Sequence, residues 1–499
     1  LFLLGDLGSL KSAIEGYRKA GNPVWAAVAE SHTDKRRVIA LDFLRAEGAR
    51  YQLALALLRD PTASHLEEAS RLVHLGGYRG LRWRIAYERG LRQPKGLRWF
   101  RVALREMSDL RNGVQSAAAR TAFYADKQAA LRTILERLLA QGRVEEALRA
   151  VASTRAVTLF EEIVSAQGLD PNLAAEAASL ANAEPDSGTR RGRTARAPAL
   201  PDLTCLPRST SPGSDGQGTT FVFGEGLWSL GKEVQRWDSG ADWIEREAAW
   251  ARFEVVSGAS GRSVHTLRER FDAAAHGVLC LDGPLWSLPW HAMFPDRPLS
   301  FRFHPGNPTH DPELPPDPKV AIWAGAFEDL PWVEREVEWL LQRYPKARVC
   351  RSATEVRASW EDPCDQVHVA THASFHPESG MWSSLRFPDG EVFALEIARS
   401  RFRTQLAVLQ ACETGALDAR ISNEPQGLVR AFLACGARAV AASLWPLDDQ
   451  ASYVATQALY DSLGQVPLPQ ALHGARLAVR QAKESPYHWA GLALYYGYA

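Results

Sequence analysis

Short, uniformly apolar runs alternate with amphipathic segments over the C-terminal half of this 499-residue chain. Strands that are apolar on both faces are typical of parallel sheets covered on both sides by helices. We therefore expect an α/β domain with a mainly parallel sheet over residues 219–499. The clearest strand candidates are VAIWAGAF (320–327), QVHVATH (366–372), QLAVLQAC (405–412) and ARAVAASLW (437–445).

Two earlier segments also predict strands. TTFVFGEGLWSL (219–230) is typical of a hairpin, and VLCLDGPLWSLPW (278–290) indicates two strands joined by an Asp-Gly turn. WVEREVEWLLQRY, which follows the apolar run at 320–327, has the spacing of an amphipathic helix.

Residues 1–183 have a different pattern, with apolar residues recurring every three or four positions in helix-length segments. Helices of this size in succession favour an α-solenoid, and a plain helical bundle is the alternative. Within residues 122–164 we expect a helix, a Gln-Gly turn and a second helix, with Ala147 and Ala150 allowing a close approach.

Residues 184–218 are dominated by Pro, Gly, Ser, Thr and Arg, which predicts a flexible linker or an exposed loop. A basic cluster within it (Arg190, Arg191, Arg193 and Arg196) has two interpretations: a solvated tether, or a site of processing or partner contact.

The composition excludes several classes of protein. Lys+Arg and Asp+Glu are both 58, so the net charge gives no reason to expect direct nucleic-acid binding. No run reaches 18 uncharged apolar residues, and the six cysteines form no CxxC pair. We expect a cytoplasmic protein without membrane spans, disulfide framework or cofactor. Because the chain opens with Leu1, we also expect it to be part of a longer protein.

Two strand ends carry residues that could act together in catalysis. One expected strand ends at His372 and another ends at Cys412. Neighbouring parallel strands bring their carboxyl ends to one edge of a sheet, where function gathers in such folds. An imidazole beside a thiol can hold it as a thiolate, which attacks a carbonyl carbon. Gln410-Ala411-Cys412 also matches the Gln-Ala-Cys motif of caspases.

Residues 219–499 resemble the CHAT domain, a relative of caspases and separase. The matching segments include DGPLWSLPWHAMF, VHVATHASF, LAVLQACETG, QGLVRAFLACGARAVAASLWPLDDQA and YHWAGLALYYG. Residues 122–164 are similar to the last tetratricopeptide-type (TPR) helix pair before such a domain. The resemblance implies a caspase-like α/β domain after TPR-like helices, with His372 as the base and Cys412 as the nucleophile.

The resemblance also implies an oxyanion hole formed by the backbone N–H groups of Ala373 and Cys412. The family usually has Gly after the histidine, and Ala373 keeps the donor while losing glycine's freedom at positive φ. In separase-like relatives an Asp after the Trp-rich strand receives a basic substrate residue. Asp449 is the closest match, with Asp448 and Glu413 beside the site. The other interpretation is that Asp448 or Asp449 caps the following helix.

His368, His372 and His376 are spaced by four residues, as metal ligands on a helix can be. The apolar residues between the first two predict a strand, so no metal site is expected. We expect His368 to pack in the core and His376 to lie in a loop.

The functional prediction is a partner-regulated cysteine endopeptidase that cleaves a specific protein. Helical repeats present surfaces that bind partners, so a regulatory protein or ribonucleoprotein is expected to bind residues 1–183. The resemblance places such proteins in prokaryotic signalling and defence, including CRISPR-associated systems. The alternative is a catalytically silent scaffold that keeps the helices and the peptidase fold for protein binding.

Overall fold

The computed structural model describes 7–33, 36–93, 96–115, 117–154, 159, 218–223, 226–231, 234–238, 241–258, 261–304, 311–376, 379–400, 402–411, 415 and 427–497. The chain divides into two compact units, Leu1–Ser116 and Ala117–Ala499. Each unit has its own arrangement of elements.

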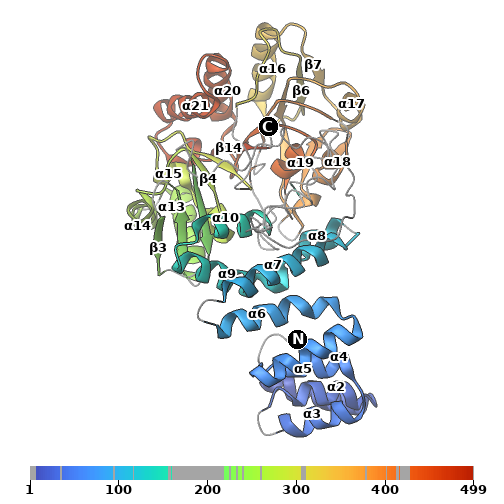
Figure 1. Ribbon diagram of the computed structural model, residues 1–499. Coiled ribbons are helices and arrows are strands. Elements are labelled where there is room, and N and C mark those ends of the chain that lie inside the picture. The colour runs from blue at the N-terminus through green and yellow to red at the C-terminus, as the bar shows by residue number, and fades with distance from the viewer. Residues whose placement is uncertain are drawn as a thin grey trace, which may run out of the picture. The chain divides into compact units, whose positions relative to one another are not determined.

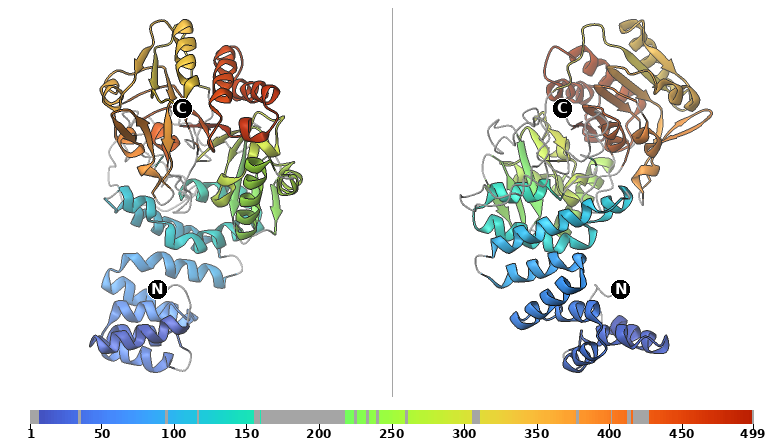
Figure 2. Two further views of the ribbon diagram at one scale, coloured as in Figure 1. Left: turned by 180° about the vertical axis from the view of Figure 1, so that it is seen from behind. Right: turned by 45° about the vertical axis from the view of Figure 1, so that its right-hand side comes forward.

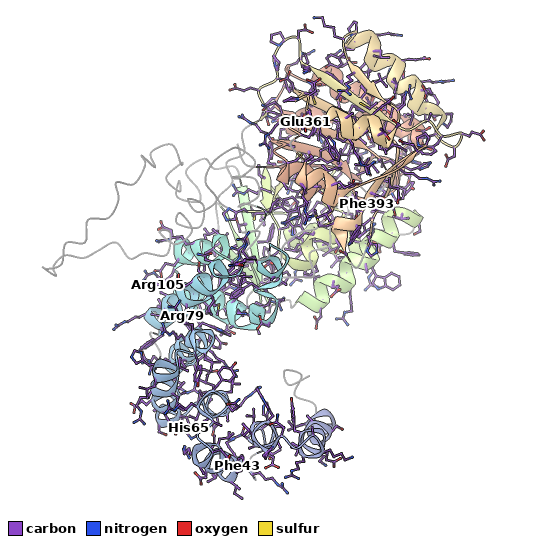
Figure 3. All side chains as sticks on the ribbon, turned by 90° about the vertical axis from the view of Figure 1, so that its right-hand side faces the viewer. Phe43, His65, Arg79, Arg105, Glu361 and Phe393 are labelled. Carbon is purple, nitrogen blue, oxygen red and sulfur yellow. The ribbon has the colours of Figure 1, made fainter. Side chains whose placement is uncertain are left out.

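The first unit is entirely helical in its described part, and each helix packs against the next along the chain (Figure 1). In the last helix, Phe100, Ala103, Leu104 and Met107 are buried, which is the i, i+3, i+4, i+7 spacing of one helix face. Figure 3 labels Phe43, His65, Arg79 and Arg105 along this unit. The helices are α1 (Leu7–Lys19), α2 (Pro23–Glu30), α3 (Arg37–Ala46), α4 (Arg50–Leu57), α5 (Ala63–Gly76), η1 (Arg79–Leu81), α6 (Arg82–Arg92) and α7 (Leu97–Asn112).

The second unit begins with helices α8 (Ala117–Ala122), α9 (Gln128–Ala140) and α10 (Val144–Ala152), with η2 (Ala125–Lys127) between the first two. Gln141 and Gly142, at φ 70°, turn the chain between α9 and α10. Ala147 and Ala150 are buried. The helix, Gln-Gly turn and helix predicted from sequence are therefore confirmed. The assignment of the helices to a TPR repeat stays a prediction.

The expected linker falls almost wholly outside the described residues. Its positions 184–217 are among those not described, and Gly218 is the first residue of strand β1. The arginine cluster at 190–196 lies outside the described residues as well.

In the described part of this unit, eleven strands form one sheet in the order β3-β2-β1-β4-β5-β14-β13-β12-β8-β6-β7. Most neighbouring pairs are parallel. The antiparallel pairs are β1–β2, β2–β3 and β13–β14. The mainly parallel sheet is thereby confirmed. The strands are β1 (Gly218–Phe223), β2 (Leu227–Leu230), β3 (Val234–Trp237), β4 (Val278–Cys280), β5 (Ser300–Arg302), β6 (Val320–Ala324), β7 (Arg348–Cys350), β8 (Gln366–Ala370), β12 (Leu406–Gln410), β13 (Ala439–Ser443) and β14 (Leu492–Tyr496).

Both faces of the central strands are buried, because alternate residues of β6, β8, β12, β13 and β14 enter two separate cores. In β12, for example, Ala407 and Leu409 join one core while Leu406 and Val408 join the other. Figure 1 shows helices on both sides of the strands. The helices are α13 (Ala241–Ser257), α14 (Arg262–Phe271), α15 (Trp290–Met293), α16 (Pro331–Arg343), α17 (Ala353–Ser359), α18 (Ala394–Arg399), α19 (Leu428–Ala434), α20 (Asp449–Ser462), α21 (Leu468–Ala482) and α22 (Pro486–Trp489).

The two early strand predictions have different outcomes. Strands β1 and β2 form the expected hairpin. The second strand expected within 278–290 is wrong, because β4 is followed by the 3-10 helix η4 (Gly283–Ser287) and by α15. Pro284 explains the difference, since proline lacks the N–H of a ladder and its fixed φ suits the first turn of a helix.

A second, three-stranded sheet stands at the margin of this unit, with the orange β10–β11 hairpin visible at its edge (Figure 2, right). Its strands are β9 (His372–Ser374), β10 (Ser384–Phe387) and β11 (Gly390–Phe393), all antiparallel, and η5 (Gly380–Trp382) precedes β10. Among the described helices of both units, none has the length and apolar character needed to cross a membrane.

Glu136 connects α9 to the edge of the large sheet. Its carboxylate accepts hydrogen bonds from Trp228 Nε1 at 2.7 Å and from Arg236 Nε at 3.1 Å. His304, after β5, makes a second connection through its Nε2, 2.8 Å from Ala152 O at the end of α10. The α9–α10 pair is therefore bound to the sheet within one unit.

We predict that Glu136→Ala destabilises the second unit by about 2 kcal/mol, because the buried indole N–H of Trp228 loses its acceptor. Chemical denaturation followed by tryptophan fluorescence would measure the change. Glu145→Ala removes an exposed glutamate of α10 and should change stability by less than about 0.5 kcal/mol. Equal effects of the two variants would contradict the prediction.

Candidate active site

Strands β8 and β12 are neighbours in the large sheet and run parallel, so their carboxyl ends meet at one edge. Their last residues, Ala370 and Gln410, lie opposite each other. In the sequence His372 follows Ala370 by two positions, and Cys412 follows Gln410 by two positions. Cys412 itself and Glu413 lie outside the described residues. The strand ends from which both sequence-predicted catalytic residues continue are therefore in register.

His372 is not the last residue of its strand, as the sequence pattern predicted. Strand β8 ends at Ala370, and His372 opens β9 in the small sheet. Thr371, between the two strands, donates a hydrogen bond to the backbone oxygen of Arg386 in β10. The chain thus passes from one sheet into the other just before the histidine, which positions the imidazole beyond the edge of the large sheet.

The imidazole of His372 contacts an acidic residue and an aromatic ring. Its Nε2 lies 3.0 Å from Asp329 Oδ1, and the Phe327 ring centroid lies 4.9 Å from its own. The hydrogen bond from His372 lowers the pKa of the Asp329 carboxyl below its usual value. The His372 side chain is 26% exposed and that of Asp329 72%. The site is therefore open to solvent on the carboxylate side.

Asp329 was missed in the sequence analysis. It lies in the loop between β6 and α16, and β6 is the other neighbour of β8, with Ala324 opposite Ala370. The available signal in the sequence was an acidic residue shortly after the apolar run that forms β6. The signal was weak, because strand order within a sheet is not visible in the sequence.

The loop between β6 and α16 approaches the end of β8 closely. Gly325 N donates to Ala370 O at 3.0 Å. A side-chain Cβ at Gly325 would overlap the Thr371 hydroxyl and the Phe327 ring. Only glycine permits this approach of the two chain segments. The loop is thereby held against the residues that lead into His372.

The chain on either side of Cys412 is also held by described contacts. Gln410 Oε1 accepts a hydrogen bond from Ser452 Oγ of α20 at 3.0 Å. Gly415 N donates to Ser443 O, at the end of β13, at 2.7 Å. These bonds attach both flanks of the nucleophile candidate to neighbouring elements at the same sheet edge.

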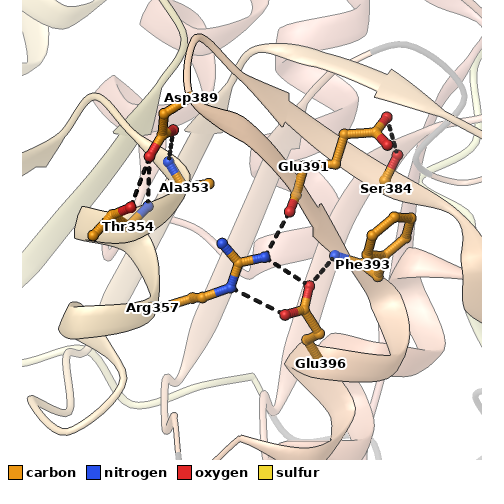
Figure 4. Close-up of polar contacts among 8 residues, drawn as sticks. All are labelled: Ala353, Thr354, Arg357, Ser384, Asp389, Glu391, Phe393 and Glu396. Carbon is orange, nitrogen blue, oxygen red and sulfur yellow. Dashed lines mark hydrogen bonds and ion pairs between the residues drawn. The ribbon is translucent and has the colours of Figure 1, made fainter.

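The small sheet that carries His372 is bound to the main domain by a polar network (Figure 4). Arg357 of α17 donates Nε and Nη2 to the two carboxylate oxygens of Glu396, both at 3.0 Å, and Nη2 also to Glu391 O at 2.7 Å. Asp389, in the β10–β11 turn, accepts from Thr354 N at 3.1 Å and from Thr354 Oγ1 at 2.8 Å. Helix α17 therefore holds the hairpin that pairs with β9.

The two aspartates after β13 have different roles in the described structure. Asp448 caps α20, accepting from Ala451 N at 2.9 Å, and it also pairs with Lys483. Asp449 Oδ2 accepts from Trp332 N, at the start of α16, at 2.7 Å. Burial raises the pKa of Asp449, and the nearby charge of Asp329 is among the further causes. The helix-cap interpretation thus describes Asp448, while Asp449 lies within electrostatic range of the partner of His372.

The proposed oxyanion donor Ala373 lies in β9 opposite Leu385 of β10 and is half-buried. The four cysteines that the structure describes (Cys280, Cys350, Cys364 and Cys435) are all buried and free of disulfides. Burial raises the pKa of the Cys364 and Cys435 thiols to about 12. Such thiols are poor nucleophiles at neutral pH. Cys205, like Cys412, is outside the described residues.

The other two histidines of the four-residue series do not lie with His372. His368 is fully buried in β8, with Nδ1 3.1 Å from the Tyr460 hydroxyl and Nε2 3.3 Å from Glu336 Oε1. His376 lies after β9, and its Nδ1 accepts from Ser379 N at 3.1 Å. Both placements agree with the core and loop predictions. Within the described ranges, no group of three or more His, Cys, Asp or Glu residues could hold a metal ion.

We predict that Arg357→Ala lowers the unfolding free energy by about 1 kcal/mol, since the bidentate pair with Glu396 is partly exposed. We also predict that it slows alkylation of Cys412, because His372 is then held less firmly. Differential scanning fluorimetry and the alkylation rate of Cys412 would measure the two effects. Arg45→Ala is a matched control, because Arg45 and Glu68 form a similar bidentate pair in the first unit. If Arg45→Ala slows alkylation as much as Arg357→Ala, the network does not act through His372.

Part of the chain matches a known family model, and its fold is similar to that of solved structures. Residues 295–497 match the family model of the CHAT domain. A Saccharomyces cerevisiae separase–securin structure aligns over 98% of this chain and 46% of the separase chain, with a TM-score of 0.50 and 10% sequence identity. The chain therefore spans just under half of that structure. The Arg-specific cysteine proteinase gingipain R aligns over 52% of this chain and 73% of its own, with 10% identity and a TM-score of 0.32.

No curated protein sequence matches the chain. At 10% identity the separase alignment is informative about fold alone, and it agrees with an N-terminal helical region followed by a mainly parallel sheet domain. The family match covers the strands β6, β8, β12 and β13 that meet at the candidate site. Residues 295–497 are thus similar to the CHAT domain family, in a chain whose fold is similar to that of the separase structure.

Proposed function

We propose that the protein is a cysteine endopeptidase in which His372 is the general base and Cys412 the nucleophile. The observation that carries the proposal is the register of β8 and β12, from whose aligned ends the two residues continue. The CHAT match over residues 295–497 supports the same class of activity. The burial of the other described thiols leaves them unsuited to this chemistry.

In the proposed reaction, the imidazole of His372 accepts the thiol proton and the Cys412 sulfur attacks the scissile carbonyl carbon. The backbone N–H groups of Ala373 and Cys412 stabilise the oxyanion that forms. The imidazolium then protonates the departing amine, leaving a thioester. Water, deprotonated by the same imidazole, releases the acid product and restores the thiol.

For specificity, we propose that Asp449 binds a basic residue of the substrate, with Asp448 and Glu413 contributing to the negative character of the region. Asp449 is half-buried, and its second carboxylate oxygen remains available for a guanidinium or ammonium group once Trp332 N has bonded the first. The partial burial strengthens such a pair relative to one in water.

The helical region is proposed to regulate the peptidase by binding a partner, either a protein or a ribonucleoprotein. The separase neighbour was solved in complex with securin, which is a precedent for a protein partner on a similar fold. The resemblance to TPR-CHAT proteins is the basis for proposing a cytoplasmic role in prokaryotic signalling or defence, including a CRISPR-associated one.

We predict that Cys412→Ala abolishes hydrolysis, lowering kcat by more than about 1,000-fold, because no other described thiol is accessible. Hydrolysis of peptide mixtures and candidate proteins, with and without candidate activators, would measure it by mass spectrometry. Cys364→Ala, at a buried thiol before the amino end of β8, should retain activity. If wild type and Cys412→Ala behave alike under every condition, the scaffold alternative is favoured.

We predict that Asp449→Asn reduces cleavage after Arg or Lys by about 10- to 100-fold while sparing other residues, because one carboxylate charge is lost. Asparagine keeps an oxygen for Trp332 N, so α16 retains its cap. Profiling cleavage sites in a peptide library would test this. Asp461→Asn, at an exposed aspartate paired with Arg343, is the control. An unchanged preference would rule out this role for Asp449.

A further inference from the structure

The hydrogen bond between His372 and Asp329 determines which imidazole nitrogen can act as a base. An ionised carboxylate only accepts hydrogen bonds, so Nε2 carries the proton and donates it to Asp329 Oδ1 at 3.0 Å. Nδ1 is then left with its lone pair. In the neutral imidazole this is the nitrogen that can accept a thiol proton.

We propose that Asp329 is a positioning residue for His372, holding the ring and its tautomer so that Nδ1 serves as the base toward Cys412. The inference rests on the proposed peptidase function and names a third residue for it. Asp329 acts through the imidazole in this arrangement and does not need to touch the substrate. The expected consequence is a better-oriented base and a more stable imidazolium during the reaction.

The imidazole has a second contact from the same loop. The Phe327 ring lies against it at 4.9 Å and an interplanar angle of 55°. Arg386, directly across the β9–β10 ladder from His372, places its guanidinium 5.6 Å from the Phe327 ring centroid. Phe327 and Asp329 therefore contact the ring by an apolar face and by an acceptor, and together they restrict its rotation.

The loop that carries both residues is itself fixed at each end. At its start, Gly325 N bonds Ala370 O, and a larger residue at position 325 would not fit. At its end, Leu330 N donates to Phe327 O at 3.1 Å, and Trp332 N donates to Asp449. Asp329 is thus held in place before any substrate binds, as a preorganised catalytic group requires.

Asp329 contributes little to the fold, which makes it suitable for testing. Its side chain is 72% exposed, and exposed pairs of this kind stabilise proteins only weakly. The variants Asp329→Asn and Asp329→Ala should therefore fold with melting temperatures close to that of the wild type. A change in reactivity without a change in melting temperature would separate positioning from structural support.

The experiment measures iodoacetamide alkylation of Cys412 in the full chain as a function of pH, with Cys412→Ala defining the background from other thiols. We expect Asp329→Asn and Asp329→Ala to slow alkylation near neutral pH by about tenfold. The alkaline limb of the hydrolysis profile should move to lower pH, because the imidazolium loses the negative charge beside it. Asp329→Glu should restore part of the rate.

Asp362→Asn is the matched control, because Asp362 is also an exposed aspartate with a lowered pKa, paired with Lys319 rather than with His372. It should leave the rate and the profile unchanged. On a cleaved peptide, the Asp329 variants should lower kcat by about 10- to 100-fold with little change in KM. The proposal would be overturned if Asp329→Asn and Asp329→Ala both kept the wild-type pH profile. It would also be overturned if these variants changed only the KM for basic substrates.

These outcomes are distinct from a failure of the proposed function. If wild-type alkylation equals that of Cys412→Ala at every pH and no peptide is cleaved, Cys412 is not an activated nucleophile and the peptidase proposal fails. If the wild type shows activated Cys412 and the Asp329 variants match it, the peptidase proposal stands and the positioning role of Asp329 is wrong.

Discussion

The in-register parallel pairing of β8 with β6 on one side and β12 on the other is the constraint on which the candidate site depends. Each strand buries alternate residues in two separate cores, so shifting the register by one residue would expose a full set of apolar side chains. The burial of both faces therefore holds the carboxyl ends of three strands at one level. The loop with Asp329, the entry to His372 and the entry to Cys412 all begin from that level.

Beyond this edge, His372 depends on contacts that the large sheet does not supply. The histidine belongs to the small sheet, which helix α17 holds through Arg357 and through the cap made by Asp389 (Figure 4). These contacts are partly exposed and individually weak. His372 is attached more weakly than the strands of the large sheet. A bound partner could therefore shift the histidine relative to the sheet edge at small energetic cost. The α9–α10 pair, bound to the far edge strands through Glu136, belongs to the same unit.

Much of the fold followed from periodicity alone. The runs 320–327, 366–372, 405–412 and 437–445 each contain a strand of the large sheet, because apolar residues on both faces are compatible with few other structures. The prediction failed at 278–290, where Pro284 and the turn at Gly283 favour a 3-10 helix over a returning strand. The prediction also placed His372 at the end of β8, whereas it is the first residue of β9. The chain changes from one sheet to the other within a continuous strand-like run, and such a change does not alter the hydrophobic periodicity.

By itself the sequence determined that a helical region precedes a mainly parallel sheet, and it named His372 and Cys412 as candidates, because local hydrophobic periodicity and short motifs carry that information. Only the tertiary structure decided that Asp329 meets the imidazole, that Asp448 is a helix cap, and that Arg357 holds the small sheet. These residues are separated by dozens of positions along the chain. Their contacts arise from strand order and loop path, which depend on the packing of the whole domain.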